Sequence, residues 1–176
     1  MFSFVVGGAA SGKSEYAEGL VLSSPHRPRY YIATMEPFDG EGRRRVENHR
    51  RMRADKEFET VECYCNLSCV RLPGRGVVLL ECIGNLAANE LYSPQGAGSV
   101  DGALSAITGG VDSLLIQCAD LVVVSNEVFT GGADYAAGTE DYLRLVARVN
   151  RALAQRADRV CEVICGLPWY YKGAAE

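Results

Sequence analysis

Short apolar segments alternate with longer helix-like segments along most of this chain. The apolar segments are rich in Val, Ile, Leu or Tyr, as buried strands are, and they cover residues 2–6, 29–34, 76–80, 120–125 and 159–164. The helix-like segments between them cover residues 13–22, 41–54, 82–92, 101–118 and 139–157. This alternation predicts an α/β fold, with a mainly parallel sheet covered by helices on both faces.

Gly and Pro cluster between these segments and predict loops at residues 23–28, 73–76, 93–102 and 129–138. The last two are long. In folds of this class, ligands usually bind at loops that follow the carboxyl ends of parallel strands.

Length and charge narrow the class of protein. The 176 residues suffice for one sizeable core and are too few for two ordinary domains, so we expect a single domain over residues 1–176. With 18 basic and 22 acidic residues, the net charge of −4 argues against a nucleic acid partner. The sequence shows no signal peptide and no apolar run that could span a membrane, which predicts a cytoplasmic protein.

The seven cysteines form an odd set, which in a cytosolic protein indicates reduced thiols. The spacing of Cys63, Cys65 and Cys69 could suit a metal ion, but a structural zinc site usually shows two paired ligand clusters. We therefore favour ordinary packing cysteines.

The segment from Gly7 to Ser14, GGAASGKS, matches G-x-x-x-x-G-K-[ST] at every fixed position. It lies between a predicted strand and a predicted helix, which is the context that a phosphate-binding P-loop requires. Its glycines let backbone N–H groups approach phosphate oxygens. We expect Lys13 to be an exposed cation beside the outer phosphates and the Ser14 hydroxyl to bind Mg²⁺.

An acidic residue at the end of a buried strand would complete such a site. Glu81 ends the apolar run 77–80 and could reach the magnesium ion directly or through water. Glu127, after 122–126, is an alternative that lies slightly farther along its strand. Glu81 could also be an ordinary charge near a helix N-terminus.

Residues 43–53 form a strongly basic segment that contains one of the two histidines. Three interpretations compete: a solvated charged face, a nucleic acid patch, or a triphosphate-binding helix in which His49 is a nucleophile. On a helix, Arg45 and Arg53 would lie one turn either side of His49, and their charges would keep its imidazole neutral and nucleophilic near pH 7. The residues alone leave the three open.

Several motifs together resemble a known family over nearly the whole chain. They are G-G-A-x-S-G-K-S-x-Y-A-E at 7–18, Y-I-A-T at 31–34, R-V-x-x-H-R at 45–50, T-x-E at 60–62, L-L-E-C at 79–82 with Asn89, N-E-V at 126–128, the pattern Asn150 to Asp158, and Gly166-x-Pro168. In these residues the chain resembles the bifunctional adenosylcobinamide kinase/adenosylcobinamide-phosphate guanylyltransferases, which have a P-loop NTPase-like fold.

The resemblance implies a two-step reaction in cobalamin (vitamin B12) biosynthesis. A nucleoside triphosphate first phosphorylates the hydroxyl group of adenosylcobinamide. GMP is then transferred from GTP through a guanylyl-histidine intermediate, which gives adenosylcobinamide-GDP. The implied substrates are GTP, ATP and the corrinoid, the implied metal ion is Mg²⁺, and the implied assembly is a homotrimer.

The resemblance also implies roles for individual residues. His49 would be the guanylylated histidine, and Lys13 would act with it in catalysis. Ser14 and Glu81 would bind the metal ion. The implied nucleotide contacts are Gly7, Gly8, Ala9, Ala10, Ser11, Gly12, Lys13, Ser14, Ala33, Thr34, Met35, His49, Arg50, Arg51, Met52, Glu62 and Glu81.

The chain departs from the family pattern in three places. The family's G-x-G-x-x-P after N-E-V is replaced by residues 129–134, the following helix differs over 140–147, and Gly84 stands where threonine is common. These departures concern the corrinoid contacts and the phosphorylation step rather than the triphosphate site. Two other functions remain open, a different small-molecule P-loop kinase and a nucleotide-dependent regulatory protein without turnover.

Overall fold

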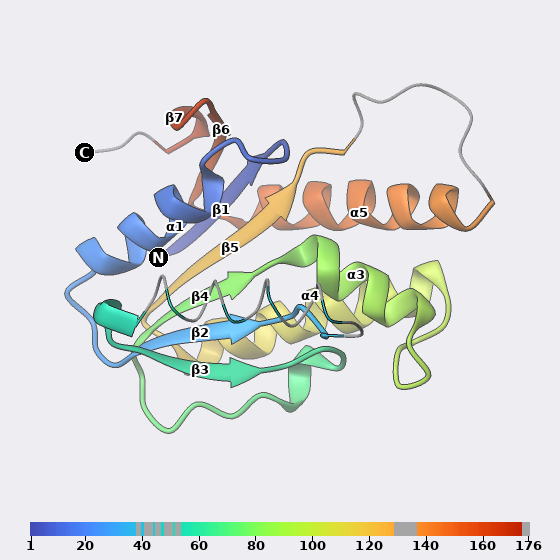
Figure 1. Ribbon diagram of the computed structural model, residues 1–176, viewed down its shortest axis with the longest axis horizontal. Helices are drawn as coiled ribbons and strands as arrows, with labels where there is room; N and C mark the ends of the chain where they lie inside the picture. The colour runs from blue at the N-terminus through green and yellow to red at the C-terminus, as the bar shows by residue number, and fades with distance from the viewer. Residues whose placement is uncertain are drawn as a thin grey trace.

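The computed structural model describes residues 1–37, 40, 44, 47, 51, 54–128 and 137–173. Within them, seven strands form one sheet in the order β3-β2-β4-β5-β1-β6-β7 (Figure 1). The strands are β1 (Phe2–Gly7), β2 (Arg29–Ala33), β3 (Phe58–Glu62), β4 (Val77–Glu81), β5 (Asp120–Asn126), β6 (Arg159–Ile164) and β7 (Leu167–Lys172). The helices are α1 (Lys13–Ser23), α3 (Ile83–Tyr92), α4 (Val100–Gln117) and α5 (Ala137–Arg156), with short 3₁₀ turns η1 (Ala54–Lys56) and η2 (Leu67–Cys69).

The predicted architecture is confirmed. All pairings are parallel except that of β7, which runs antiparallel to β6. Two strands were missed by the pattern of apolar residues, and both lie at edges of the sheet. Because an edge strand is covered less than a central one, β3 carries exposed polar side chains and almost all of β7 is exposed, so neither has the continuous apolar run of a buried strand.

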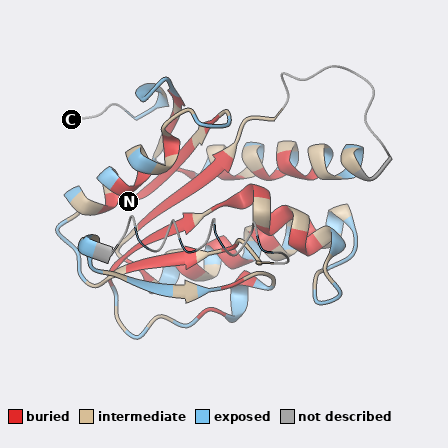
Figure 2. Cartoon of the chain, viewed as in Figure 1, coloured by how far each residue is buried: buried red, intermediate tan, exposed pale blue. Residues whose placement is uncertain are grey.

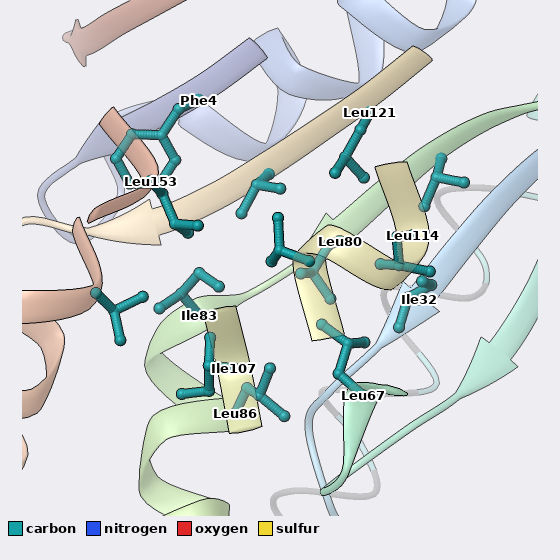
Figure 3. Close-up of a cluster of buried hydrophobic side chains, with 14 of the residues drawn as sticks. Phe4, Ile32, Leu67, Leu80, Ile83, Leu86, Ile107, Leu114, Leu121 and Leu153 are labelled. Carbon is teal, nitrogen blue, oxygen red and sulfur yellow. The ribbon is translucent and has the colours of Figure 1, made fainter. Parts of the chain in front are cut away.

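Helices cover both faces of the sheet, as Figure 2 shows by the buried residues along the central strands. Successive side chains of a strand point to opposite faces, so Phe4 packs toward α3, α4 and α5 while Val5 packs toward α1. The larger core, drawn in Figure 3, includes Leu80, Ile83, Ile107, Leu121 and Leu153. No helix in the described part of the chain is both long and apolar enough to cross a membrane.

The parallel register brings the carboxyl ends of distant segments to one edge of the sheet. Gly7 at the end of β1 is aligned with Asn126 at the end of β5. Ala33 at the end of β2 is aligned with Glu62 on one side and Glu81 on the other. This edge therefore gathers the residues that the sequence motifs single out. Of the loop predicted at 129–138, residues 129–136 fall outside the residues that the structure describes.

Candidate active site

The P-loop connects β1 to α1 through a tight turn. Gly12 has a φ of +88° and Ala10 a φ of +55°, both in the left-handed region that favours glycine. A side chain at Gly12 would also come within 3.0 Å of the Gly166 Cα atom, and one at Gly7 within 2.8 Å of the Val163 carbonyl oxygen. Gly12 is thus required by both backbone conformation and close packing, and Gly7 by close packing.

Two neighbouring segments hold the loop in place. The Gly166 N–H, in the turn between β6 and β7, donates a hydrogen bond to the Ser11 carbonyl at 2.8 Å, and the Glu127 N–H donates to the Gly7 carbonyl at 3.0 Å. The Ser11 hydroxyl is buried without a hydrogen-bond partner in the described part of the chain. These supports were not predicted from the sequence, although Gly166 belongs to one of the quoted motifs.

Lys13 is almost buried, so the prediction of an exposed loop cation was wrong. Only 9% of the residue is exposed, and its ammonium donates to the Gly8 carbonyl at 2.9 Å. The side chain lies back over its own loop because α1 starts at Lys13 and packs directly on the sheet. The ammonium therefore lies against the backbone of its own loop.

Ser14 and Glu81 meet beneath the loop. The Ser14 hydroxyl donates to Glu81 Oε1 across 67 residues of sequence. The other carboxylate oxygen, Oε2, accepts a hydrogen bond from the Tyr31 hydroxyl at 3.1 Å. A hydroxyl and a carboxylate are oxygen ligands of the kind that Mg²⁺ prefers, so the pair is suited to that ion. The contact between Tyr31 and Glu81 was not predicted from the sequence.

Thr34 fixes the chain around Glu81. It is fully buried, and its hydroxyl donates to the Cys82 carbonyl at 2.9 Å and accepts from the Cys82 N–H at 2.7 Å. The Asn89 amide in turn donates to the Thr34 carbonyl at 2.9 Å. Thr34 thus ties the end of β2 to the residue after Glu81, and its part in nucleotide binding, like those of Ala33 and Met35, stays a prediction.

Glu62 lies apart from the Ser14–Glu81 pair. Strand β2 lies between β3, which carries Glu62, and β4, which carries Glu81. The backbones of Glu62 and Glu81 are therefore roughly 10 Å apart, twice the spacing of neighbouring strands. Its carboxylate accepts from the Tyr64 hydroxyl at 2.9 Å and lines a groove of about 590 Å³ with Glu36 and Arg71. Glu62 therefore belongs to a second recess on the same edge of the sheet.

The three cysteines of residues 63–69 also line this groove. Cys63 is buried, and its Sγ donates to the Cys65 carbonyl at 3.4 Å. Burial is the main cause that raises the pKa of the Cys63 thiol to about 11. Among the described residues, no three His, Cys, Asp or Glu side chains are grouped as a metal site would need, and all seven cysteines are free thiols.

The basic segment is mostly outside the described residues. His49, Arg50 and Met52 fall there, whereas Arg51 is described and exposed. The predicted roles of these four residues stay predictions.

Two of the departures from the family pattern are in contact. A side chain at Gly84, the second residue of α3, would come within 2.7 Å of the Asn126 amide nitrogen and 3.1 Å of the Tyr142 hydroxyl. Tyr142 belongs to the altered helix segment at the start of α5, and burial raises the pKa of its phenol. Tyr142 and Asn126 thus occupy the space that a threonine at position 84 would take.

Sequence comparison gives consistent matches. Residues 3–170 match the family model described as cobinamide kinase / cobinamide phosphate guanyltransferase. The chain is 33% identical to the bifunctional adenosylcobalamin biosynthesis protein CobU of Escherichia coli (strain K12), with 95% of this chain and 97% of that protein covered. It is 32% identical to CobU of Salmonella typhimurium, with the same coverage, and 31% identical to CobP of Pseudomonas aeruginosa, with 98% of each chain covered.

Structural comparison adds a likeness in fold. The crystal structure of the flagellar accessory protein FlaH from Methanocaldococcus jannaschii matches with a TM-score of 0.52 at 12% identity. The match covers 97% of this chain and 77% of that chain. At this identity it supports the P-loop NTPase-like fold alone.

Proposed function

Because the chain belongs to the cobinamide kinase / cobinamide phosphate guanyltransferase family, we propose that a single triphosphate site, built from the P-loop with Ser14 and Glu81, serves both reactions. The protein is a bifunctional enzyme of cobalamin biosynthesis, an adenosylcobinamide kinase and adenosylcobinamide-phosphate guanylyltransferase. The proposal of one shared site rests on the hydrogen bond between Ser14, at the end of the P-loop, and Glu81.

The loop binds the phosphates of GTP or ATP through its backbone N–H groups and the positive end of α1. Lys13 exchanges the Gly8 carbonyl for a phosphate oxygen, which is a stronger acceptor for an ammonium because it is charged. Ser14 and Glu81 hold Mg²⁺, with Tyr31 orienting the carboxylate. When bound, the ion supplies neutralisation of the charge on the phosphates.

The two reactions attack different phosphorus atoms. In the kinase step the corrinoid hydroxyl forms a bond to the γ-phosphorus, loses its proton, and the nucleoside diphosphate leaves with the electrons of the broken P–O bond. In the second reaction a ring nitrogen of His49 bonds to the α-phosphorus of GTP and pyrophosphate leaves. A phosphate oxygen of adenosylcobinamide phosphate then displaces His49 and forms adenosylcobinamide-GDP. Lys13 and the loop N–H groups stabilise the charge on the leaving phosphates in each case.

We assign the nucleotide contacts Ala33, Thr34, Met35, Arg50, Arg51, Met52 and Glu62 by the same family membership. The recess at Glu62 supports this assignment, because it opens on the edge of the sheet that carries the P-loop. We also place the enzyme in the cytoplasm, as one nucleotide-binding domain over residues 1–176.

A homo-oligomer, a trimer by family resemblance, completes the proposal. β7 is an edge strand whose alternate residues Leu167, Trp169 and Tyr171 are each more than 60% exposed. Such a row of apolar side chains on an unpaired strand edge favours association with another chain. Light scattering of Trp169→Lys should then show a smaller particle than the natural protein, and an unchanged mass would exclude β7 from the interface.

The decisive experiment is intact mass spectrometry after incubation with GTP and Mg²⁺. We expect a covalent GMP adduct on the natural protein and its loss in His49→Asn, with nucleotide binding retained. His26, the other histidine, provides the matched control, because it is exposed and lies beside Asp120, near the end of the sheet opposite the P-loop. An adduct that persists in His49→Asn, or disappears in His26→Asn, would refute the assignment of the nucleophile.

A further inference from the structure

A second cavity lies at the opposite end of the sheet from the P-loop. It has a volume of about 460 Å³ and lies between α1 and the amino-terminal ends of the strands. Ser3, on its floor, precedes Gly7 by four strand residues, so the two are roughly 13 Å apart along β1. The cavity is therefore separate from the triphosphate site, although α1 borders both.

An unpaired cation lines this cavity. Arg159, the first residue of β6, is aligned with Ser3 of β1 and is only partly exposed. Within the described residues its guanidinium makes neither a hydrogen bond nor an ion pair, whereas Arg148 and Arg156 on the other face of the sheet each contact an aspartate. A partly buried guanidinium without an acceptor retains its capacity for bidentate binding of an anion.

Unused hydroxyl groups converge on the same space. Ser3 is only 6% exposed, and in the described part of the chain its hydroxyl has no hydrogen-bond partner. The hydroxyls of Tyr16 and Tyr170 contact each other across the cavity wall. In such a pair one hydroxyl donates its hydrogen to the other. The hydroxyl that accepts still has its own hydrogen, which remains available to a ligand.

Charges around the cavity leave its Arg159 side positive. Burial, more than the hydrogen bond with Tyr170, raises the pKa of Tyr16 far above its usual range, so the phenol stays a neutral donor, and the charge of Arg159 opposes this shift. Asp120, the acidic residue in the lining, is already bound by the Ser24 hydroxyl at 2.7 Å and the Met1 amino group at 2.9 Å, with His26 at 3.9 Å. Its negative charge is thus compensated within the protein.

Apolar side chains form part of the remaining wall, beside Ser23 and Ser24 at the carboxyl end of α1. Leu20 comes from α1, Val77 from β4 and Val122 from β5, and these strand residues belong to the core on the α1 face of the sheet. A cavity with apolar walls and a few convergent polar groups is typical of sites for small molecules. Its volume lies within the range of such sites, so the lining determines which class of molecule would fit.

We propose that this cavity binds a small organic carboxylate with an apolar body. The carboxylate pairs with the Arg159 guanidinium and accepts hydrogen bonds from the Ser3 hydroxyl and from the free hydrogen of the Tyr16–Tyr170 pair. The apolar body lies against Leu20, Val77 and Val122. Neither the kinase nor the guanylyltransferase reaction uses these groups, so the site is additional to the proposed function.

Benzoate is a suitable probe, and benzamide is its neutral counterpart of nearly equal shape. Titration followed by NMR, with saturating GTP and Mg²⁺ present, measures binding away from the P-loop. We expect saturable binding of benzoate and at least about tenfold weaker binding of benzamide, because a charge-assisted hydrogen bond contributes more than a neutral one. Arg159→Met should weaken benzoate about tenfold or more, whereas Arg144→Met, an exposed arginine on α5, should leave its affinity unchanged.

Variants of the hydroxyl groups test the rest of the site. Ser3→Ala and Tyr170→Phe should each weaken benzoate without abolishing it, since Arg159 remains. Equal affinity for benzamide, unchanged affinity in Arg159→Met, or displacement of benzoate by GTP would each overturn the proposal. The GMP adduct of His49 does not depend on this cavity, so failure here and failure of the proposed function are separate results.

Discussion

At the scale of single residues, Glu81 connects the P-loop to the sheet. Its two carboxylate oxygens accept from Ser14 and Tyr31. We predict that Glu81→Gln lowers kcat of both reactions by about 10²-fold, because the amide lacks the charge that holds Mg²⁺. Steady-state assays with each corrinoid substrate measure this loss. The matched variant Glu59→Gln, at an exposed site on β3, should keep full activity. Equal kcat in the two variants would remove Glu81 from the site.

Buried thiols give a second prediction at this scale. Burial raises the pKa of Cys63, Cys118 and Cys161 to about 11. Between pH 9 and 11 the unfolded chain therefore releases thiol protons that the folded chain retains, so the free energy of unfolding falls as pH rises through this window. Urea denaturation at pH 8, 9 and 10 should show this fall. In Cys118→Ala the free energy of unfolding should fall less steeply with pH. An identical pH dependence would contradict the raised pKa of Cys118 in the folded protein.

At the scale of elements, the start of α3 and the start of α5 are fitted to each other. Gly84 leaves room for the Tyr142 hydroxyl and the Asn126 amide. We predict that Gly84→Thr lowers the free energy of unfolding by about 1–3 kcal/mol, because the new side chain overpacks this contact. Adding Tyr142→Ala should cost less in the Gly84→Thr background than in the natural protein. Additive losses in this double-mutant cycle would show that the two positions are independent.

At the scale of the whole molecule, the sequence keeps the family pattern in some segments and departs from it in others. The P-loop keeps the motif and Ser14 contacts Glu81, whereas residues 129–134 and 140–147 depart from the family pattern. We predict that guanylyl transfer to adenosylcobinamide phosphate has a higher kcat/KM than phosphorylation of adenosylcobinamide. The kinase step requires the corrinoid hydroxyl to be held at the γ-phosphate, and a misplacement of ~1 Å can cost ~10²-fold.

The two substrates should be supplied separately to the same preparation of enzyme, with kcat/KM measured for each. The proposed guanylylation of His49 needs no corrinoid, so the yield of the GMP adduct provides an internal measure of an intact triphosphate site. Equal efficiencies for alcohol and phosphate would mean that the altered segments are neutral variation.

The sequence by itself determined the architecture and the phosphate-binding loop of this protein. Central strands bury both faces, so their apolar runs identify them without knowledge of their partners. The P-loop is equally local, since its glycines, Lys13 and Ser14 are consecutive along the chain. Family resemblance added Glu62, and for His49 and Glu81 it favoured one of the interpretations that the residues had left open.

Only the tertiary structure decided which distant groups meet. Glu81 contacts Ser14 and Tyr31, Ser11 contacts Gly166, and Arg159 has no acceptor among the described residues. These features depend on strand order and register, which hydrophobic periodicity does not encode. The edge strands β3 and β7 escaped prediction because their exposed residues carry no signal of burial. The exposure of Lys13 was predicted wrongly for a related reason. Local sequence gives the charge of a side chain, but its burial is set by how the neighbouring helix packs on the sheet.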